Sequence, residues 1–334
     1  MTAWLRLFRR NRWVLAAAFL SPLPVHGQLF SRTTEPGTPV VILDPSTGSI
    51  QRVAVTGETS YGSVSGLDPD GRRIFVLGLG PSGQRIITID LLTGSVFSAP
   101  LATSVPDRPL ELHFDPATRT VLAISNLGIV LQIDPETGSV RTEVGNFVIY
   151  PVTASAFDPV ARRLFAINGD TAQTLQILDL DPVQLTLHSI ASVRSYGFLK
   201  WDPVAQRLLS ATSESGVPIV SIDPNTGSVV PFVDTGSPVL PYQSALDTAG
   251  RRLFFLSFVP VATGGVSWSL YTVNLADGSV AVRSLAPGTD YLFLQFVPLL
   301  ITDVPLLGFA GLAALMVGLA VTGLFLAGRV NMGR

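Results

Sequence analysis

The chain has 334 residues, of which 47% are hydrophobic, and a formal net charge of −2. This composition is typical of a folded globular protein and argues against disorder and against nucleic-acid binding. The chain has no cysteine, which excludes disulfide bonds, thiol catalysis and cysteine-ligated metal sites. Lys200 is the only lysine, so Schiff-base chemistry would have a single candidate.

The first 27 residues have the pattern of a secretory signal peptide. Basic residues precede the short apolar run WVLAAAFL, which is too short to span a bilayer. Val25 and Gly27 are the small residues expected at positions −3 and −1 of a cleavage site. The sequence therefore predicts export, with cleavage before Gln28. Residues 28–38 are predicted to be a linker.

From residue 39 to residue 298 the chain repeats one pattern. Its copies include FDPATRTVLAIS from Phe114 and FDPVARRLFAIN from Phe157. A period of about 45 residues is the signature of a repeat architecture. The first conserved turn of each copy begins with an aspartate: Asp68, Asp115, Asp158, Asp202 and Asp247.

A second turn recurs in each repeat, as in DPETG from Asp134 and DPNTG from Asp223. Here Asp can accept backbone N–H bonds, Pro presets φ and Gly supplies a left-handed position, as in a type I turn followed by a bulge. The runs between turns have the length and β-branched content of strands. Four short strands per repeat predict the blades of a β-propeller.

The two turns differ in number, and this difference predicts how the ring closes. The second turn occurs six times, because Asp44, Asp90, Asp179 and Asn274 add to the two above. Residues 39–55 therefore supply two outer strands and residues 290–298 an inner strand. We expect these two segments to pair in a composite sixth blade, which removes exposed sheet edges. The fold prediction is an all-β, six-bladed β-propeller spanning residues 39–298.

Two stretches carry a family resemblance. SGLDPDGRRIFVLG and IVSIDPNTGSVV resemble the YVTN-type propeller repeats of prokaryotic surface-layer proteins. The resemblance covers the repeats and implies the blade architecture, although members of this family often have seven blades. It implies little about chemistry, because propellers serve as binding modules, scaffolds and enzymes.

The end of the chain predicts a membrane helix. After a linker at residues 299–305, residues 306–327 contain no charged residue and are long enough to span a bilayer. Arg329 and Arg334 in the tail, residues 328–334, favour a cytoplasmic C-terminus. The segment also resembles the sorting signals that exosortase-type enzymes process, with Val304-Pro305 at the motif position, but the acidic or Ser-Glu-Trp residues expected in that motif are absent. A weak helix-pairing face is formed by Ala310, Ala314, Gly318 and Thr322.

About half of the 24 acidic residues belong to the two repeated turns, so they are interpreted as structural. Each caps the backbone of its own turn rather than serving as a catalytic carboxylate. The structural set is Asp44, Asp68, Asp115, Asp134, Asp158, Asp202, Asp223 and Asp247. Four arginines recur at one turn position and are expected to brace the turns or face solvent: Arg72, Arg119, Arg162 and Arg251.

The candidate site is the central channel. Glu111 and His113 lie two apart on an inner strand and therefore on one face of it. The other candidates on inner strands are Lys200, Tyr242, Gln243 and Gln295. One histidine and one carboxylate fall short of a catalytic zinc set. No cofactor is predicted, and a calcium ion held by carbonyls and waters remains an alternative.

The function is predicted from the small number of candidate catalytic and metal-binding side chains. The favoured hypothesis is an exported binding or scaffolding module, tethered in the periplasm or at the cell surface, whose partner is a protein, peptide or glycan. Variable loops on one face, such as SFVPVATGGVS after Leu256, would carry its specificity together with the channel mouth. The alternative is a channel enzyme, lactonase-like or quinoprotein-like, with Glu111 and His113 as acid–base or metal-binding residues.

Overall fold

The computed structural model describes residues 27–298, except 36, 38, 57–60, 81–82, 104–108, 150, 170–172, 191–195, 213–218, 236–240, 261–265 and 287–288. Residues 27–297 form one compact unit. The predicted signal peptide, the terminal helix and the basic tail lie outside the described residues, apart from Gly27. Within the described ranges, no helix is long and apolar enough to cross a membrane.

The described strands form six antiparallel sheets of four strands each. Blade 1 is β4 (Tyr61–Asp68), β5 (Arg73–Gly80), β6 (Gly83–Asp90) and β7 (Val96–Pro100). Blade 2 is β8 (Pro109–Asp115), β9 (Thr120–Ser125), β10 (Ile129–Ile133) and β11 (Val140–Asn146). Blade 3 is β12 (Val152–Asp158), β13 (Arg163–Asn168), β14 (Thr174–Leu180) and β15 (Val183–Ser189).

Blade 4 is β16 (Tyr196–Asp202), β17 (Arg207–Thr212), β18 (Ile219–Ile222) and β19 (Val229–Val233). Blade 5 is β20 (Pro241–Asp247), β21 (Arg252–Pro260), β22 (Val266–Asn274) and β23 (Val280–Ser284). Blade 6 combines β24 (Tyr291–Val297) with β1 (Gln28–Thr33), β2 (Pro39–Leu43) and β3 (Ile50–Val55).

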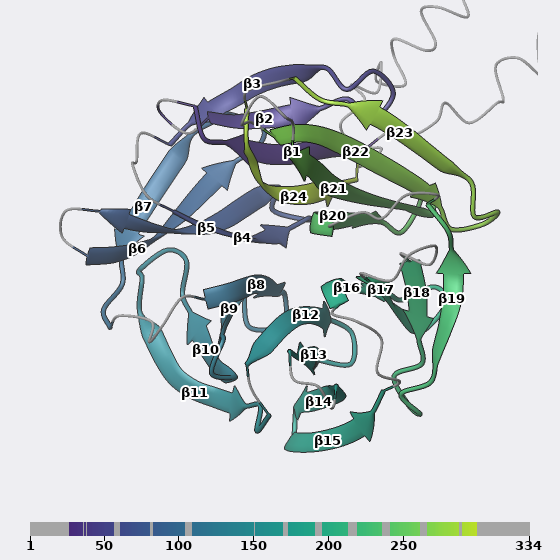
Figure 1. Cartoon of the computed structure of the whole chain (residues 1–334). Coiled ribbons are helices and arrows are strands. Elements are labelled where there is room, and N and C mark those ends of the chain that lie inside the picture. Colours follow the sequence, from purple (N-terminus) through teal and green to yellow (C-terminus); the bar gives the residue numbers. More distant parts are fainter. Residues whose placement is uncertain are drawn as a thin grey trace, which may run out of the picture. The chain divides into compact units, whose positions relative to one another are not determined.

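The blades close into a ring around a common centre (Figure 1). The innermost strands are β4, β8, β12, β16, β20 and β24, and each packs against the next, including β24 against β4. Six apolar clusters fill the six interfaces between neighbouring blades. The cluster that closes the ring joins Phe30 and Phe293 of blade 6 to Ile74 and Val76 of blade 1. The predicted six-bladed propeller is therefore confirmed.

Blade 6 differs from the prediction in one respect. Residues 28–38 were predicted to be a linker, yet Gln28–Thr33 forms β1, which lies between β24 and β2. The predicted direct pairing of residues 39–55 with 290–298 is therefore wrong. The N-terminal end supplies three strands, and the missing sixth copy of the first turn is the chain break between β24 and β1. Ring closure by a composite blade holds.

A second difference concerns the long segment after Leu256. The sequence SFVPVATGGVS predicts a variable loop. In the structure β21 and β22 continue pairing as far as Pro260 and Val266. Only residues 261–265 remain between them, and these lie outside the described residues. The segment is mainly an extended hairpin, because Phe258 packs against Trp268 and this contact stabilises the longer strand pairing.

The turns follow the chemistry expected from the sequence. Asp44 accepts the backbone N–H of Ser46 at 2.8 Å, and Gly48 has a φ of +75°. Hydrogen bonds from Ser46 hold the pKa of the Asp44 carboxyl below its ordinary value. The other seven aspartates of the predicted structural set also accept backbone N–H groups of their own turns: Asp68, Asp115, Asp134, Asp158, Asp202, Asp223 and Asp247.

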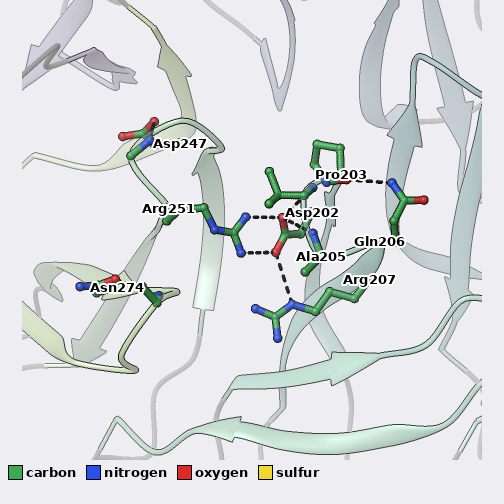
Figure 2. Close-up of polar contacts among 11 residues, drawn as sticks. Asp202, Pro203, Ala205, Gln206, Arg207, Asp247, Arg251 and Asn274 are labelled. Carbon is green, nitrogen blue, oxygen red and sulfur yellow. Dashed lines mark hydrogen bonds and ion pairs between the residues drawn. The ribbon is translucent and has the colours of Figure 1, made fainter.

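Two of the recurring turn arginines clamp neighbouring blades together. Arg251 of blade 5 donates to both carboxylate oxygens of Asp202 in blade 4, at 2.5 and 2.8 Å, and Figure 2 shows this bidentate contact. Arg162 of blade 3 likewise reaches Asp115 of blade 2 at 2.9 Å. Both arginines adopt a positive φ of about 51°, which is costly for a residue with a Cβ. The expected turn-bracing role therefore extends across the blade interface.

Burial sets the electrostatics of this clamp. The Asp202 side chain is fully buried, which alone would raise its pKa, but Arg251, the N–H of Ala205 and Arg207 outweigh burial and lower it. The hydrogen bond to Asp202 in turn raises the pKa of Arg251. The carboxylate therefore stays charged inside the interface, where its two arginine partners satisfy it.

Candidate functional site: the central cavity

A cavity of about 470 Å³ lies at the centre of the ring. The inner strands of all six blades contribute to its lining, from Val64 in blade 1 to Gln295 in blade 6. This volume is within the range of small-molecule sites. The lining also includes Pro69, Asp70, Pro116 and Pro159, which belong to the first Asp-Pro turns. The cavity therefore extends to the face of the ring that carries the first Asp-Pro turns. The sequence predicts a purely structural role for those turns.

The polar lining follows an alternation between blades. At one inner-strand position, which lies two residues before the first turn in blades 1 to 5, the even-numbered blades carry long polar side chains, namely His113, Lys200 and Gln295. The odd-numbered blades carry Gly66, Ala156 and Ala245 at this position. The six positions are structurally equivalent, because each of these residues pairs with the third residue of the second strand of its own blade. Of these six residues, only the three long ones line the cavity.

The small residues of the odd blades are paired with large aromatic residues. Gly66, Ala156 and Ala245 are paired with Phe75, Phe165 and Phe254, and each of these phenylalanines is fully buried. Paired residues in an antiparallel sheet lie side by side on one face. Gln295 of blade 6 is also paired with a buried phenylalanine, Phe30, so the paired ring alone does not set the length of the inner-strand side chain.

The preceding position alternates in the opposite sense. The odd blades have serine there, Ser65, Ser155 and Ser244, where the even blades have leucine. Two of the serines bond the long polar side chain of the blade before them. His113 Nε2 lies 2.8 Å from Ser155 Oγ, and Gln295 Nε2 donates to Ser65 Oγ at 3.1 Å and to the Ser65 carbonyl at 2.9 Å. The six blades thus form three pairs with approximate threefold symmetry.

Ser155 also holds Glu111. Its hydroxyl donates to Glu111 Oε2 at 2.7 Å, and the same carboxylate oxygen is 3.4 Å from His113 Nε2. Because the Ser155 hydroxyl donates to Glu111, its oxygen can accept a hydrogen bond from His113 Nε2–H. Ser155 is only 1% exposed and does not line the cavity. It therefore positions Glu111 and His113, whose side chains do line it.

The third pair differs from the other two. Lys200 lines the cavity in blade 4, and Ser244 occupies the serine position of blade 5. The Ser244 side chain is 3% exposed, and its hydroxyl has no hydrogen-bond partner among the described residues. Within the same part of the chain, Lys200 Nζ makes no hydrogen bond or ion pair. Neither the amine nor the hydroxyl that the symmetry would bring together has a partner among the described residues, and only the hydroxyl is buried.

Five of the six predicted site residues line one cavity: Glu111, His113, Lys200, Gln243 and Gln295. Tyr242 belongs to β20, but its side chain lies outside the described part of the structure. The three serines are not among the predicted site residues. Their signal was present in the sequence, because Ser-Gly or Ser-Ala in SGLD, SAFD and SALD alternates with Leu-His, Leu-Lys or Leu-Gln in LHFD, LKWD and LQFV.

The described side chains of the cavity do not form a metal centre. In the described ranges, no three His, Asp or Glu side chains gather closely enough to hold a metal ion. Glu111 is already bonded by Ser155, and Asp68 is paired with Arg73 at 2.8 Å. The arrangement offers hydrogen bonds, one lysine and aromatic surface to a ligand.

Solved structures of other proteins share the fold. A chain in the crystal structure of a nidogen/laminin complex matches with a TM-score of 0.63 and 11% identity, over 81% of this chain and 98% of that chain. A putative TolB from Agrobacterium tumefaciens matches with a TM-score of 0.58 and 11% identity, over 82% of this chain and 99% of that one. No family model matches the sequence, and neither does any curated protein. The chain is a β-propeller, and identities this low support the fold alone.

Proposed function

We propose that this protein is an exported propeller, tethered to the membrane by residues 306–327, that binds a ligand outside the cytoplasm through its central cavity. The observation that carries the proposal is the polar lining described above, in which partners on neighbouring blades fix His113 and Gln295 in place. Pre-organised polar groups in a cavity of this size are typical of a binding site. The resemblance to surface-layer propeller repeats agrees with a place at the cell surface.

Export and tethering rest on the two ends of the sequence. Cleavage between Gly27 and Gln28 would leave all of β1 in the mature chain, so removal of the leader is compatible with a closed sixth blade. The terminal arginines would remain cytoplasmic. Sorting-type processing near Val304-Pro305 is the alternative to a plain anchor, and the mass of the membrane-bound protein separates the two.

The test of tethering uses charges in the terminal segment. A charge at the centre of a membrane helix costs about 2.5–3.5 kcal/mol on insertion scales. Leu315→Arg combined with Val317→Arg should therefore release a folded propeller into the soluble exported fraction. A wild-type protein recovered from the cytoplasm with Met1 and Arg334 both present would refute export and tethering together. Arrays of glycans and peptides, probed with the released protein, test the binding role.

A channel enzyme is the second candidate, and one observation favours it. Ser155 contacts a carboxylate and an imidazole, which are the groups that activate a serine nucleophile. The order of contacts differs from a catalytic triad, however, because the carboxylate bonds the serine rather than the second nitrogen of the imidazole. Hydrolysis of lactones or esters that disappears in Ser155→Ala and Glu111→Gln, with folding retained, would favour the enzyme over the binding module.

Calcium in the channel stays a prediction. Carbonyl oxygens and waters could hold it without a side-chain cluster. Its test is thermal unfolding of the purified protein with and without EGTA, where bound calcium requires a lower unfolding temperature in the chelator.

A further inference from the structure

The approximate threefold pattern of the cavity has one unfilled position. In blade pairs 2–3 and 6–1, the long side chain of the even blade bonds the serine of the next blade. In blade pair 4–5, Lys200 and Ser244 occupy the equivalent positions, and neither has a partner among the described residues. A buried hydroxyl without a hydrogen bond is destabilising by roughly 1–3 kcal/mol. Such a cost at a cavity wall marks a place where a ligand atom would be bound.

We propose that Lys200 Nζ and Ser244 Oγ together bind the carboxylate of a small sugar acid inside the cavity. Both groups can donate, so the missing atom is an acceptor, and the lysine charge favours an anionic one. Ser244 lines the cavity, so the proposal requires its hydroxyl to adopt a χ1 rotamer that directs Oγ into it. This inference rests on the proposed binding function and names the chemical class of its ligand.

The charges of the lining select a monoanion. Lys200 is the one permanently cationic side chain among the described lining residues, which also include the carboxylates Glu111, Asp68 and Asp70. Asp68 is neutralised by Arg73, but Glu111 and Asp70 have no arginine or lysine partner in the described part. A phosphate dianion would meet one positive charge and two negative ones. A carboxylate is matched by Lys200 alone, and it leaves Glu111 to accept from another group of the same ligand.

The remaining lining suits a polyol. Thr153, Gln243 and Gln295 carry hydroxyl and amide groups, which can donate and accept hydrogen bonds. The aromatic rings of Phe114, Phe157 and Phe198 also line the cavity. Apolar aromatic surface beside neutral amides and a carboxylate acceptor matches a sugar ring, which presents C–H groups on its faces and hydroxyls at its edge. The carboxylate subsite and the polyol subsite together describe a uronic acid.

The binding experiment uses the full chain, purified from membranes in a detergent without a sugar headgroup. Isothermal titration compares glucuronate with two neutral probes, glucuronamide and glucose. We expect glucuronate to bind at least about tenfold more tightly than either, since a hydrogen bond to a charged group is worth about this factor or more. Lys200→Met should remove that preference. Glucuronate that does not bind, or that binds Lys200→Met equally well, would overturn the proposal.

Two further variants separate the subsite from general effects on folding. Lys200→Gln places the residue found at position 295 opposite Ser244, so the third pair should close as Gln295 closes on Ser65; thermal stability should rise while glucuronate affinity falls. Ser244→Ala should weaken glucuronate binding severalfold. Its matched control is Ser257→Ala in the same blade, because Ser257 Oγ is also buried without a partner but does not line the cavity. Equal effects of the two serine variants would contradict the assignment.

Chemical labelling gives a readout at one atom. Lys200 is the only lysine, so reductive methylation with ¹³C-formaldehyde labels Lys200 Nζ and the α-amino group, and it preserves both charges. Glucuronate should shift the Lys200 methyl signal and leave the α-amino signal unchanged. Failure here is distinguishable from failure of the proposed function: array ligands that bind without moving the Lys200 signal would sustain a binding module and reject the carboxylate subsite.

Discussion

The clamp between blades 4 and 5 makes a quantitative prediction. Arg251 is 24% exposed and Asp202 is fully buried, with donor–acceptor distances of 2.5 and 2.8 Å. Removing one partner of a buried pair costs about 3–5 kcal/mol because the other charge stays buried. Arg207, 3.3 Å from Asp202, remains in Arg251→Met and reduces the effect. We expect a loss of about 2–4 kcal/mol, or about 4–8 °C in unfolding temperature for a domain of this size.

The assay is thermal unfolding followed by circular dichroism, with Gln206→Met as the matched control. Gln206 occupies the same left-handed turn position in blade 4, with a φ of +51°, but its amide bonds the Pro203 carbonyl of its own turn. The control should shift the unfolding temperature by less than about 2 °C, as expected for an exposed contact. Equal shifts in the two variants would refute the argument that the inter-blade ion pair, rather than the turn, carries the stability.

The pH dependence of unfolding provides an independent test of the ion pair between Arg251 and Asp202. The folded-state pKa of Asp202 is lowered, so its contribution is present above the unfolded-state pKa, about 3.9, and is lost as the pH falls through the folded-state value. The difference between wild type and Arg251→Met should therefore be full near pH 7 and shrink below about pH 4. A difference that grows on acidification would have the wrong sign.

The remaining predictions concern turn geometry and ring closure. Gly138→Ala should lower the free energy of unfolding by about 1–3 kcal/mol more than Gly278→Ala. Both glycines have a φ near +74°, but a Cβ at Gly138 would overlap the Pro100 carbonyl oxygen. A Cβ at Gly278 would have its nearest atom 3.5 Å away. Thermal melts of the two variants check this, and equal losses would contradict it. Gln28→Cys with Val297→Cys should form a disulfide and raise stability by about 2–4 kcal/mol under oxidising conditions, because these residues are paired across β1 and β24. Pro39→Cys with Val297→Cys should remain reduced, since β1 lies between those strands, and crosslinking of that pair instead would restore the simpler closure.

The repeat pattern made most of the fold predictable. Six second turns and five first turns required six blades with a composite closure, and turn chemistry fixed where each hairpin reverses. Strand β1 escaped prediction for a physical reason: both of its faces are covered, so Ser31, Arg32 and Thr33 are buried as completely as Leu29. A strand without alternation and without a repeated turn at its start carries no sequence signal of its own.

The site was predictable in part. Inner-strand positions followed from the repeat, which is why Glu111, His113 and Lys200 could be expected at one channel. The role of the serines could not be derived in the same way, because the contact between His113 and Ser155 crosses a blade interface and depends on how neighbouring blades are offset. The clamp between Arg251 and Asp202 has the same origin. Repeat analysis aligns equivalent residues, but it does not show which residue of the next blade each one meets.

The central claim concerns the open pair in the cavity, and a crystal structure of the protein grown with glucuronate tests it most directly. We predict density for one carboxylate whose oxygens lie within hydrogen-bonding distance of Lys200 Nζ and Ser244 Oγ, with the sugar ring toward Glu111. A direct hydrogen bond between Lys200 and Ser244 in a cavity that holds only water, at a glucuronate concentration that saturates the titration, would contradict it.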